Sequence, residues 1–167
     1  LYTNSGLRRE LYFLLKKKYN LKVIVPIRKF EAFYPSKVIG RYSSSTFKKN
    51  KKLLDNGYLQ DAWMHWKNKT IDYLVLKKIF PKNIFIVKFE DLIKKKNTLY
   101  LKKICEFLEI KFSNKMTLNT SWSIKVKPNT SYGNKVKKNL KKNLNLTKDQ
   151  IPNEYYSIYK LVEKYSY

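Results

Sequence analysis

An arginine and a serine are the residues of this sequence best placed to bind a charged ligand. Arg28 directly follows an apolar, β-branched run at residues 22–27 (KVIVPI), which predicts a buried strand. Ser36 lies eight residues further on, inside the helix predicted over residues 29–41. A guanidinium fork and a hydroxyl that converge beyond the carboxyl end of a strand can form a phosphate site. From position alone, a solvated arginine or an ion-pair partner is the commoner case.

One predicted helix carries three further candidates. His65 is the only histidine in the chain and is a weak candidate for a catalytic base, because a lone histidine on a helix is more often a packing or surface residue. Trp63 and Trp66 are most simply core residues. As an alternative, one of them faces an acceptor molecule, since aromatic faces suit sugar rings and lipids.

Two segments of the chain resemble the PAPS-dependent sulfotransferases, where PAPS is 3′-phosphoadenylyl sulfate. Residues 22–36 are similar to the family's 3′-phosphate segment, in which a strand ends in Arg and a Ser follows eight residues later. Residues 83–110 look closer still, because a strand runs into residues 89–92 (FEDL) and an amphipathic helix ends in residues 107–109 (FLE). The resemblance covers about residues 7–132.

The resemblance implies a nucleotide-binding transferase that moves a sulfuryl group from PAPS to a hydroxyl or amine and releases PAP. In the family, the residues matched by Arg28 and Ser36 contact the 3′-phosphate of the donor. Lys127, Asn129 and Ser131 resemble the late family loop that folds over the 3′-phosphate and adenosine. The expected acceptors are a carbohydrate, a lipid, a small alcohol or a protein, and no metal is expected.

Departures from the family pattern accompany this resemblance. Lys29 and Phe30 stand where the family usually has Asp-Pro or a similar pair. The family's phosphosulfate-binding loop and its catalytic base have no counterpart in the sequence, so both are expected upstream of Leu1. Residues 1–167 are therefore expected to be one partial sulfotransferase-like domain, which alone folds poorly and transfers no sulfuryl group. Glu90 and Asp91 correspond to structural residues of the family, which fix the turn after the strand.

The order of predicted elements indicates an α/β domain. Apolar strands are predicted at residues 22–27 and 83–89, and helices at residues 7–18, 29–41, 58–80, 98–109 and from 152 onward. Strands separated by helical crossovers form parallel sheets flanked by helices. The resemblance implies the P-loop-nucleotide-hydrolase-like sulfotransferase fold, incomplete at its N-terminus. Pro26 cannot donate a ladder hydrogen bond, which places the first strand near a sheet edge.

The composition leaves a second class of function open. The formal net charge is +25, with 37 Lys and Arg against 12 Asp and Glu. Such an excess suits a polyanionic partner, so the alternative is a basic nucleic-acid-binding protein without catalytic activity. The abundance of Lys, Asn, Ile and Tyr also fits AT-rich codon usage, and few of the basic residues are the arginines that groove readers favour.

Other classes are disfavoured by what the sequence lacks. A nucleotide kinase is disfavoured because the chain contains no G-x-x-x-x-G-K-[ST] motif. The single cysteine, Cys105, cannot form an internal disulfide and falls in an apolar helical stripe, which predicts a buried thiol. No apolar run reaches the length of a membrane span, and a cytoplasmic location is expected.

Overall fold

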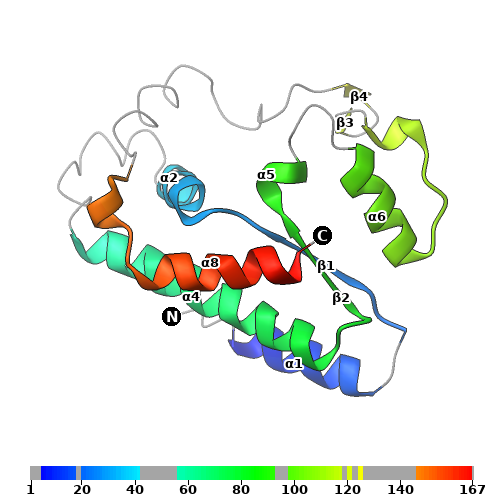
Figure 1. Ribbon diagram of the computed structural model, residues 1–167, viewed down its shortest axis with the longest axis horizontal. Coiled ribbons are helices and arrows are strands. Elements are labelled where there is room, and N and C mark those ends of the chain that lie inside the picture. Colours follow the sequence, from blue (N-terminus) through cyan, green and yellow to red (C-terminus); the bar gives the residue numbers. More distant parts are fainter. Residues whose placement is uncertain are drawn as a thin grey trace.

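A computed structural model describes residues 5–17, 20–41, 56–92, 98–117, 120–121, 124–125 and 146–166 (Figure 1). The longer elements are α1 (Ser5–Lys16), β1 (Val23–Ile27), α2 (Phe30–Arg41), α4 (Asn56–Ile79), β2 (Ile84–Lys88), α6 (Thr98–Leu108) and α8 (Glu154–Tyr165). The shorter elements are α5 (Phe89–Leu92), η2 (Asn114–Thr117), β3 (Thr120–Ser121), β4 (Ile124–Lys125) and η3 (Lys148–Gln150). The sequence predicts a polar, Lys-rich loop at residues 42–56; residues 42–55 lie outside the described residues, and α4 already begins at Asn56.

A small parallel sheet lies at the centre of the described structure. Strands β1 and β2 pair in parallel, in register from Val23 opposite Ile84 to Ile27 opposite Lys88. Parallel pairing brings both carboxyl ends to the same edge, as the sequence predicts. The α/β class is confirmed, with mostly helices and this two-stranded sheet.

Within the described sheet, strand β2 has a hydrogen-bonded neighbour on each side, whereas β1 has one on a single side. Ser166 forms a parallel bridge with Ile86, on the side of β2 away from β1. Strand β1 is therefore at an edge of the described sheet, and Pro26 is exposed there. A proline on an edge strand leaves no ladder hydrogen bond unmade, which agrees with the sequence prediction.

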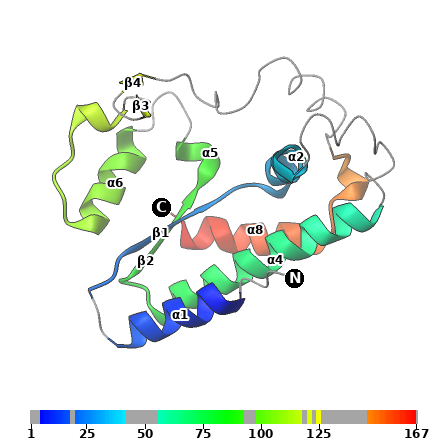
Figure 2. The ribbon, with the colours of Figure 1, turned by 180° about the vertical axis from the view of Figure 1, so that it is seen from behind.

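Helices cover both faces of β2. Figures 1 and 2 show α4 and α8 together on one side of the strands and α6 on the other. Ile84 and Ile86 are fully buried in the main core with residues of α4 and α8, while Phe85 packs on Phe107 of α6 with ring centroids 5.1 Å apart. Successive strand residues point to opposite faces, which explains this alternation.

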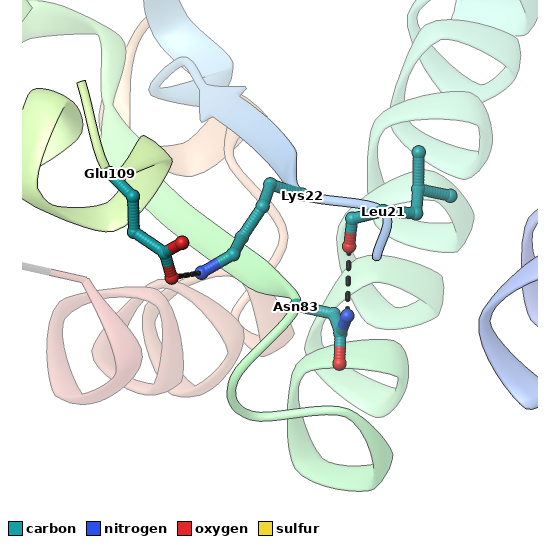
Figure 3. A network of polar contacts seen from close by, with 4 residues as sticks. All are labelled: Leu21, Lys22, Asn83 and Glu109. Carbon is teal, nitrogen blue, oxygen red and sulfur yellow. Dashed lines mark hydrogen bonds and ion pairs between the residues drawn. The ribbon is translucent and has the colours of Figure 1, made fainter. Parts of the chain in front are cut away.

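Helix α6 ends in a left-handed residue that is not glycine. Glu109 has a φ of 60°, and the Ile110 N–H donates to the Cys105 carbonyl at 2.9 Å. This is the hydrogen-bond pattern of a Schellman cap, in which glycine is the preferred residue at the left-handed position. The Glu109 carboxylate accepts a hydrogen bond from Lys22 Nζ at 2.8 Å, just before β1 begins (Figure 3). Glu109 therefore gains an ion pair but keeps an unfavourable backbone conformation.

Replacing Glu109 with glycine is expected to raise the melting temperature by a few degrees, because glycine adopts positive φ without steric cost. Lys22 holds the pKa of the Glu109 carboxyl below its ordinary value, chiefly by hydrogen bonding, so the ion pair stabilises the fold above that value and is lost as pH falls. The advantage of Glu109→Gly over the parent should therefore be larger at acidic than at neutral pH. Thermal unfolding at both pH values measures it.

Glu109→Ala is the matched control for this prediction. Alanine loses the ion pair with Lys22 but keeps the Cβ atom that opposes positive φ. This variant should melt below the parent at neutral pH and below Glu109→Gly at every pH. Equal stability of the alanine and glycine variants would show that backbone strain at Glu109 is not significant.

Candidate functional site

Arg28 lies at the carboxyl edge of the parallel sheet. It follows the last residue of β1 and precedes α2, and it is half-buried. The Cζ atom of its guanidinium lies 4.1 Å from the centroid of the Phe89 ring. Phe89 begins α5 directly after β2 ends at Lys88. Arg28 and Phe89 are the residues that directly follow the last strand pair, Ile27 opposite Lys88, so they lie beside each other at the end of the sheet.

The peptide group between Arg28 and Lys29 is held at both ends. The Arg28 carbonyl accepts a hydrogen bond from Trp66 Nε1 at 2.7 Å, and the Lys29 N–H donates to Glu90 Oε1 at 3.0 Å. Glu90 thus fixes the loop after β1, which supports its interpretation as a structural residue. Its neighbour Asp91 is buried and forms an ion pair with Lys88, with 3.3 Å between Nζ and Oδ2.

Two buried tyrosines of α8 lie among carboxylates near this loop. Burial, and then hydrogen bonding to the Glu31 carboxylate, raises the pKa of Tyr155 above its ordinary value. Burial, and then the charge of Glu90, raises the pKa of Tyr159 in the same direction. Both phenols are therefore neutral at physiological pH, and neither is prepared to act as a base.

Arg28 itself is not neutralised by these carboxylates. Among the residues that the structure describes, no Asp or Glu forms an ion pair with Arg28. Stacking on Phe89 occupies a face of the guanidinium, whereas hydrogen bonds to an anion form in the guanidinium plane. The N–H groups of Arg28 can therefore serve a phosphate or sulfate group.

Ser36 lies in the second turn of α2, and its side chain is exposed. The core-facing residues of this helix are Phe30, Tyr34 and Val38, which set its rotation. Ser36 is on the opposite, solvent-facing side. Within the described structure, no hydrogen bond joins Ser36 to Arg28, and the expected convergence of the two side chains on one phosphate stays a prediction.

The other predicted donor contacts fall on a different part of the chain. Lys127, Asn129 and Ser131 belong to residues 126–145, which lie outside the described residues. Their predicted contact with the 3′-phosphate and adenosine stays a prediction.

The two tryptophans of α4 are core residues. Trp63 and Trp66 are 4% and 3% exposed, and their rings stack with centroids 5.5 Å apart. Phe30 of α2 packs on both, with centroid distances of 5.3 Å and 6.0 Å. The core interpretation is confirmed. The acceptor-facing alternative is corrected accordingly, because neighbouring rings cover these indoles and leave little surface on which an acceptor can stack.

His65 packs beside these tryptophans on the flank of α4. Its ring stacks on Phe33 of α2, with centroids 6.0 Å apart and an interplanar angle of 13°. It is half-buried, in agreement with the packing interpretation that the sequence favours. Cys105 is buried in α6, as predicted.

Sequence reasoning missed Phe89, Glu90 and Trp66 as supports of Arg28. The register of the sheet was the available signal for Phe89. Both apolar runs were visible, and pairing their ends places the residue after β2 beside the residue after β1. The indole of Trp66 and the carboxylate of Glu90 reach the loop from 38 and 61 residues away, and no local pattern marks such contacts.

The described residues contain neither a cluster of metal-binding side chains nor a membrane-spanning helix. In that part of the chain, no three His, Cys, Asp or Glu side chains are grouped so that they could hold a metal ion. None of the helices described there is long and apolar enough to cross a membrane.

Comparison with known proteins adds no further constraint. No family model, curated protein or solved structure matches this chain.

Proposed function

We propose that this protein is a PAPS-dependent sulfotransferase and that Arg28 binds the 3′-phosphate of the donor nucleotide. The observation that carries the proposal is the guanidinium of Arg28, which lies at the carboxyl edge of the sheet without a described carboxylate partner. Ligands of parallel α/β sheets bind at this edge. The matching segments at residues 22–36 and 83–110, and the parallel pairing of their strands, support the same conclusion.

The proposed fold is the P-loop-nucleotide-hydrolase-like fold of sulfotransferases. Strand β1, the long helical crossover and β2 would form its 3′-phosphate half. The sequence FEDL at Phe89–Leu92 forms a short helical turn directly after β2, where the family has its corresponding turn. Helix α6 then packs on β2 through Phe107, as an amphipathic helix at this point of the order requires.

The proposed reaction is an in-line displacement at sulfur. An acceptor oxygen or nitrogen attacks the sulfur atom, and the bond from sulfur to the bridging phosphate oxygen breaks. PAP leaves with the electron pair of that bond, and the acceptor's proton passes to a base. By analogy with phosphoryl transfer, positioning and cationic stabilisation dominate the catalysis. Arg28 would touch the 3′-phosphate rather than the breaking bond, so it would act mainly on nucleotide affinity.

The acceptor is proposed only by class, as a carbohydrate, lipid, small alcohol or protein that carries a hydroxyl or amine. Trp63 and Trp66 would support the site from the core. Lys127, Asn129 and Ser131 are proposed to close over the 3′-phosphate and adenosine.

A basic nucleic-acid-binding protein is the second candidate, and the net charge of +25 favours it. In that case the lysines would contact the phosphodiester groups along a nucleic-acid strand, and binding would not require a terminal phosphate. Affinity carried by diffuse contacts of this kind falls steeply as salt is raised. The two candidates therefore differ in ligand and in salt dependence.

Binding of PAP and adenosine 5′-phosphate to the full-length protein tests the proposal, because the two ligands differ only in the 3′-phosphate. We expect PAP to bind at least tenfold more tightly, since one charge-assisted fork is worth more than about 1.4 kcal/mol. Random single-stranded DNA should compete weakly, and its competition should disappear at elevated salt. Isothermal titration calorimetry measures the two nucleotides, and transfer of radiolabelled sulfate from PAPS to each acceptor class measures the activity.

Two results would contradict the proposal. Equal affinity for PAP and adenosine 5′-phosphate would show that the protein has no site for the 3′-phosphate. Tight, salt-tolerant binding of DNA that excludes PAP would favour the nucleic-acid-binding candidate instead.

A further inference from the structure

We infer that Phe89, Glu90 and Trp66 are positioning residues, which hold Arg28 in the orientation that receives a terminal phosphate. This inference rests on the proposed function, because the phosphate is that of the proposed donor. It assigns a role to three side chains that do not themselves contact the nucleotide. They reach Arg28 from two elements, with Phe89 and Glu90 at the start of α5 and Trp66 in the middle of α4.

The backbone of Arg28 is fixed through a single peptide group. In a trans peptide the carbonyl and the N–H point in opposite directions, so partners on both ends determine the orientation of the plane. Here Trp66 donates to the carbonyl of Arg28, and Glu90 accepts from the N–H of Lys29. Rotation of this plane would break both hydrogen bonds. The direction in which the Arg28 side chain leaves the backbone is therefore set by α4 and α5 together.

The far end of the same side chain is fixed by Phe89. Its ring lies under the guanidinium, 4.1 Å from Cζ, and an arginine side chain otherwise loses considerable rotamer entropy when it binds a ligand. Stacking restrains the guanidinium while leaving its in-plane N–H donors open to a phosphate. Phosphate binding therefore costs less side-chain entropy at Arg28 than it would at an arginine that is not restrained by an aromatic ring.

Glu90 distinguishes positioning from simple electrostatics. Its carboxylate is negative and lies one peptide group from Arg28, so by charge alone it opposes the binding of an anion. If charge dominated, any neutral replacement of Glu90 would strengthen PAP binding. If positioning dominates, the replacement must still accept the hydrogen bond from Lys29. Glutamine retains an acceptor oxygen and alanine does not.

The experiment measures the preference for PAP over adenosine 5′-phosphate in variants of the full-length protein. We expect Glu90→Ala to reduce this preference about fivefold, the effect of one lost hydrogen bond. Glu90→Gln should keep or increase it. Phe89→Leu should reduce the preference for PAP by a similar factor. Phe89→Tyr retains an aromatic face and should therefore keep the preference of the parent protein. A purely structural role would change both nucleotide affinities equally and leave the preference unchanged.

A double variant separates this inference from the proposed function. In the Arg28→Ala background, Glu90→Ala should cause no further loss of preference, because it acts through Arg28. If Arg28→Ala leaves the preference intact, the proposed function fails. If Arg28→Ala abolishes the preference but Glu90→Ala and Phe89→Leu retain it, only the positioning role fails. Thermal unfolding of each variant confirms that the folded protein is compared.

Discussion

PAP should bind the Arg28→Ala variant about 2 kcal/mol or more weakly than the parent protein, since a phosphate loses its charged hydrogen-bonding partner. The guanidinium has no described carboxylate partner, so its removal leaves no buried carboxylate without its counter-ion. The loss should therefore appear in affinity rather than in stability. Calorimetric titration with PAP, together with thermal unfolding in the absence of nucleotide, measures both.

Three further variants serve as controls for the Arg28 prediction. Arg28→Lys keeps the charge but lacks the planar fork that stacks on Phe89, so it should restore only part of the affinity. If the exposed Ser36 hydroxyl also contacts the 3′-phosphate, Ser36→Ala should cost about 1 kcal/mol, less than Arg28→Ala, because one hydroxyl hydrogen bond is lost. Lys29→Ala removes an exposed cation next to Arg28 and should have a minor effect. If Arg28→Ala and Lys29→Ala bind PAP equally well, the site loses its main support.

The sequence was most informative about the two strands. Both are short apolar runs bounded by polar residues, and the observed bounds, Val23–Ile27 and Ile84–Lys88, differ from the predicted ones by one residue at each changed end. Buried parallel strands show this continuous apolar pattern, so periodicity and length agree. The parallel pairing followed because a helical crossover joins the two strands.

Helix α8 shows what the periodicity of one helix can miss. The spacing of apolar residues from 152 onward predicts a stripe of Ile158, Leu161, Val162 and Tyr165. Ile158 and Val162 are buried and Tyr165 packs against the core, but Leu161 is 45% exposed, and Tyr155 and Tyr159 are buried as well. Tyr155 lies 5.3 Å from Trp66 between ring centroids, and it stacks on Tyr159 at 5.5 Å. Packing of aromatic rings on the Phe30 and tryptophan cluster therefore sets the rotation of this helix, and single-helix periodicity does not contain that information.

The candidate site was only partly predictable for a related reason. The position of Arg28 follows from where an apolar strand ends, which is a local property. The exposure of Ser36 depends on the rotation of α2, which Phe30 and Val38 fix by packing on other elements. The support from Phe89, Glu90 and Trp66 is tertiary in every case, so it emerges only once the strands are paired.

Replacing Lys77 with alanine is expected to lower the free energy of unfolding by about 3 kcal/mol, through two unsatisfied carbonyls and lost packing. Lys77 is only 7% exposed in the last turn of α4. Its Nζ donates to the Pro81 carbonyl at 2.9 Å and to the Ile84 carbonyl at 2.8 Å. These bonds join the end of α4 to the beginning of β2. Denaturant unfolding of the variant and the parent measures the loss.

Lys78→Ala is the matched control, because Lys78 is exposed one residue away and its loss should change stability by less than about 0.5 kcal/mol. Lys77→Met fills the space without donating, so it should lie between the parent and Lys77→Ala. Burial lowers the pKa of Lys77, which means that the unfolded chain holds this proton more tightly. The parent should therefore gain stability relative to Lys77→Met as pH rises toward 10.5, the ordinary lysine value.

Equal denaturation midpoints for Lys77→Ala and Lys78→Ala would show that the two carbonyl contacts do not anchor β2.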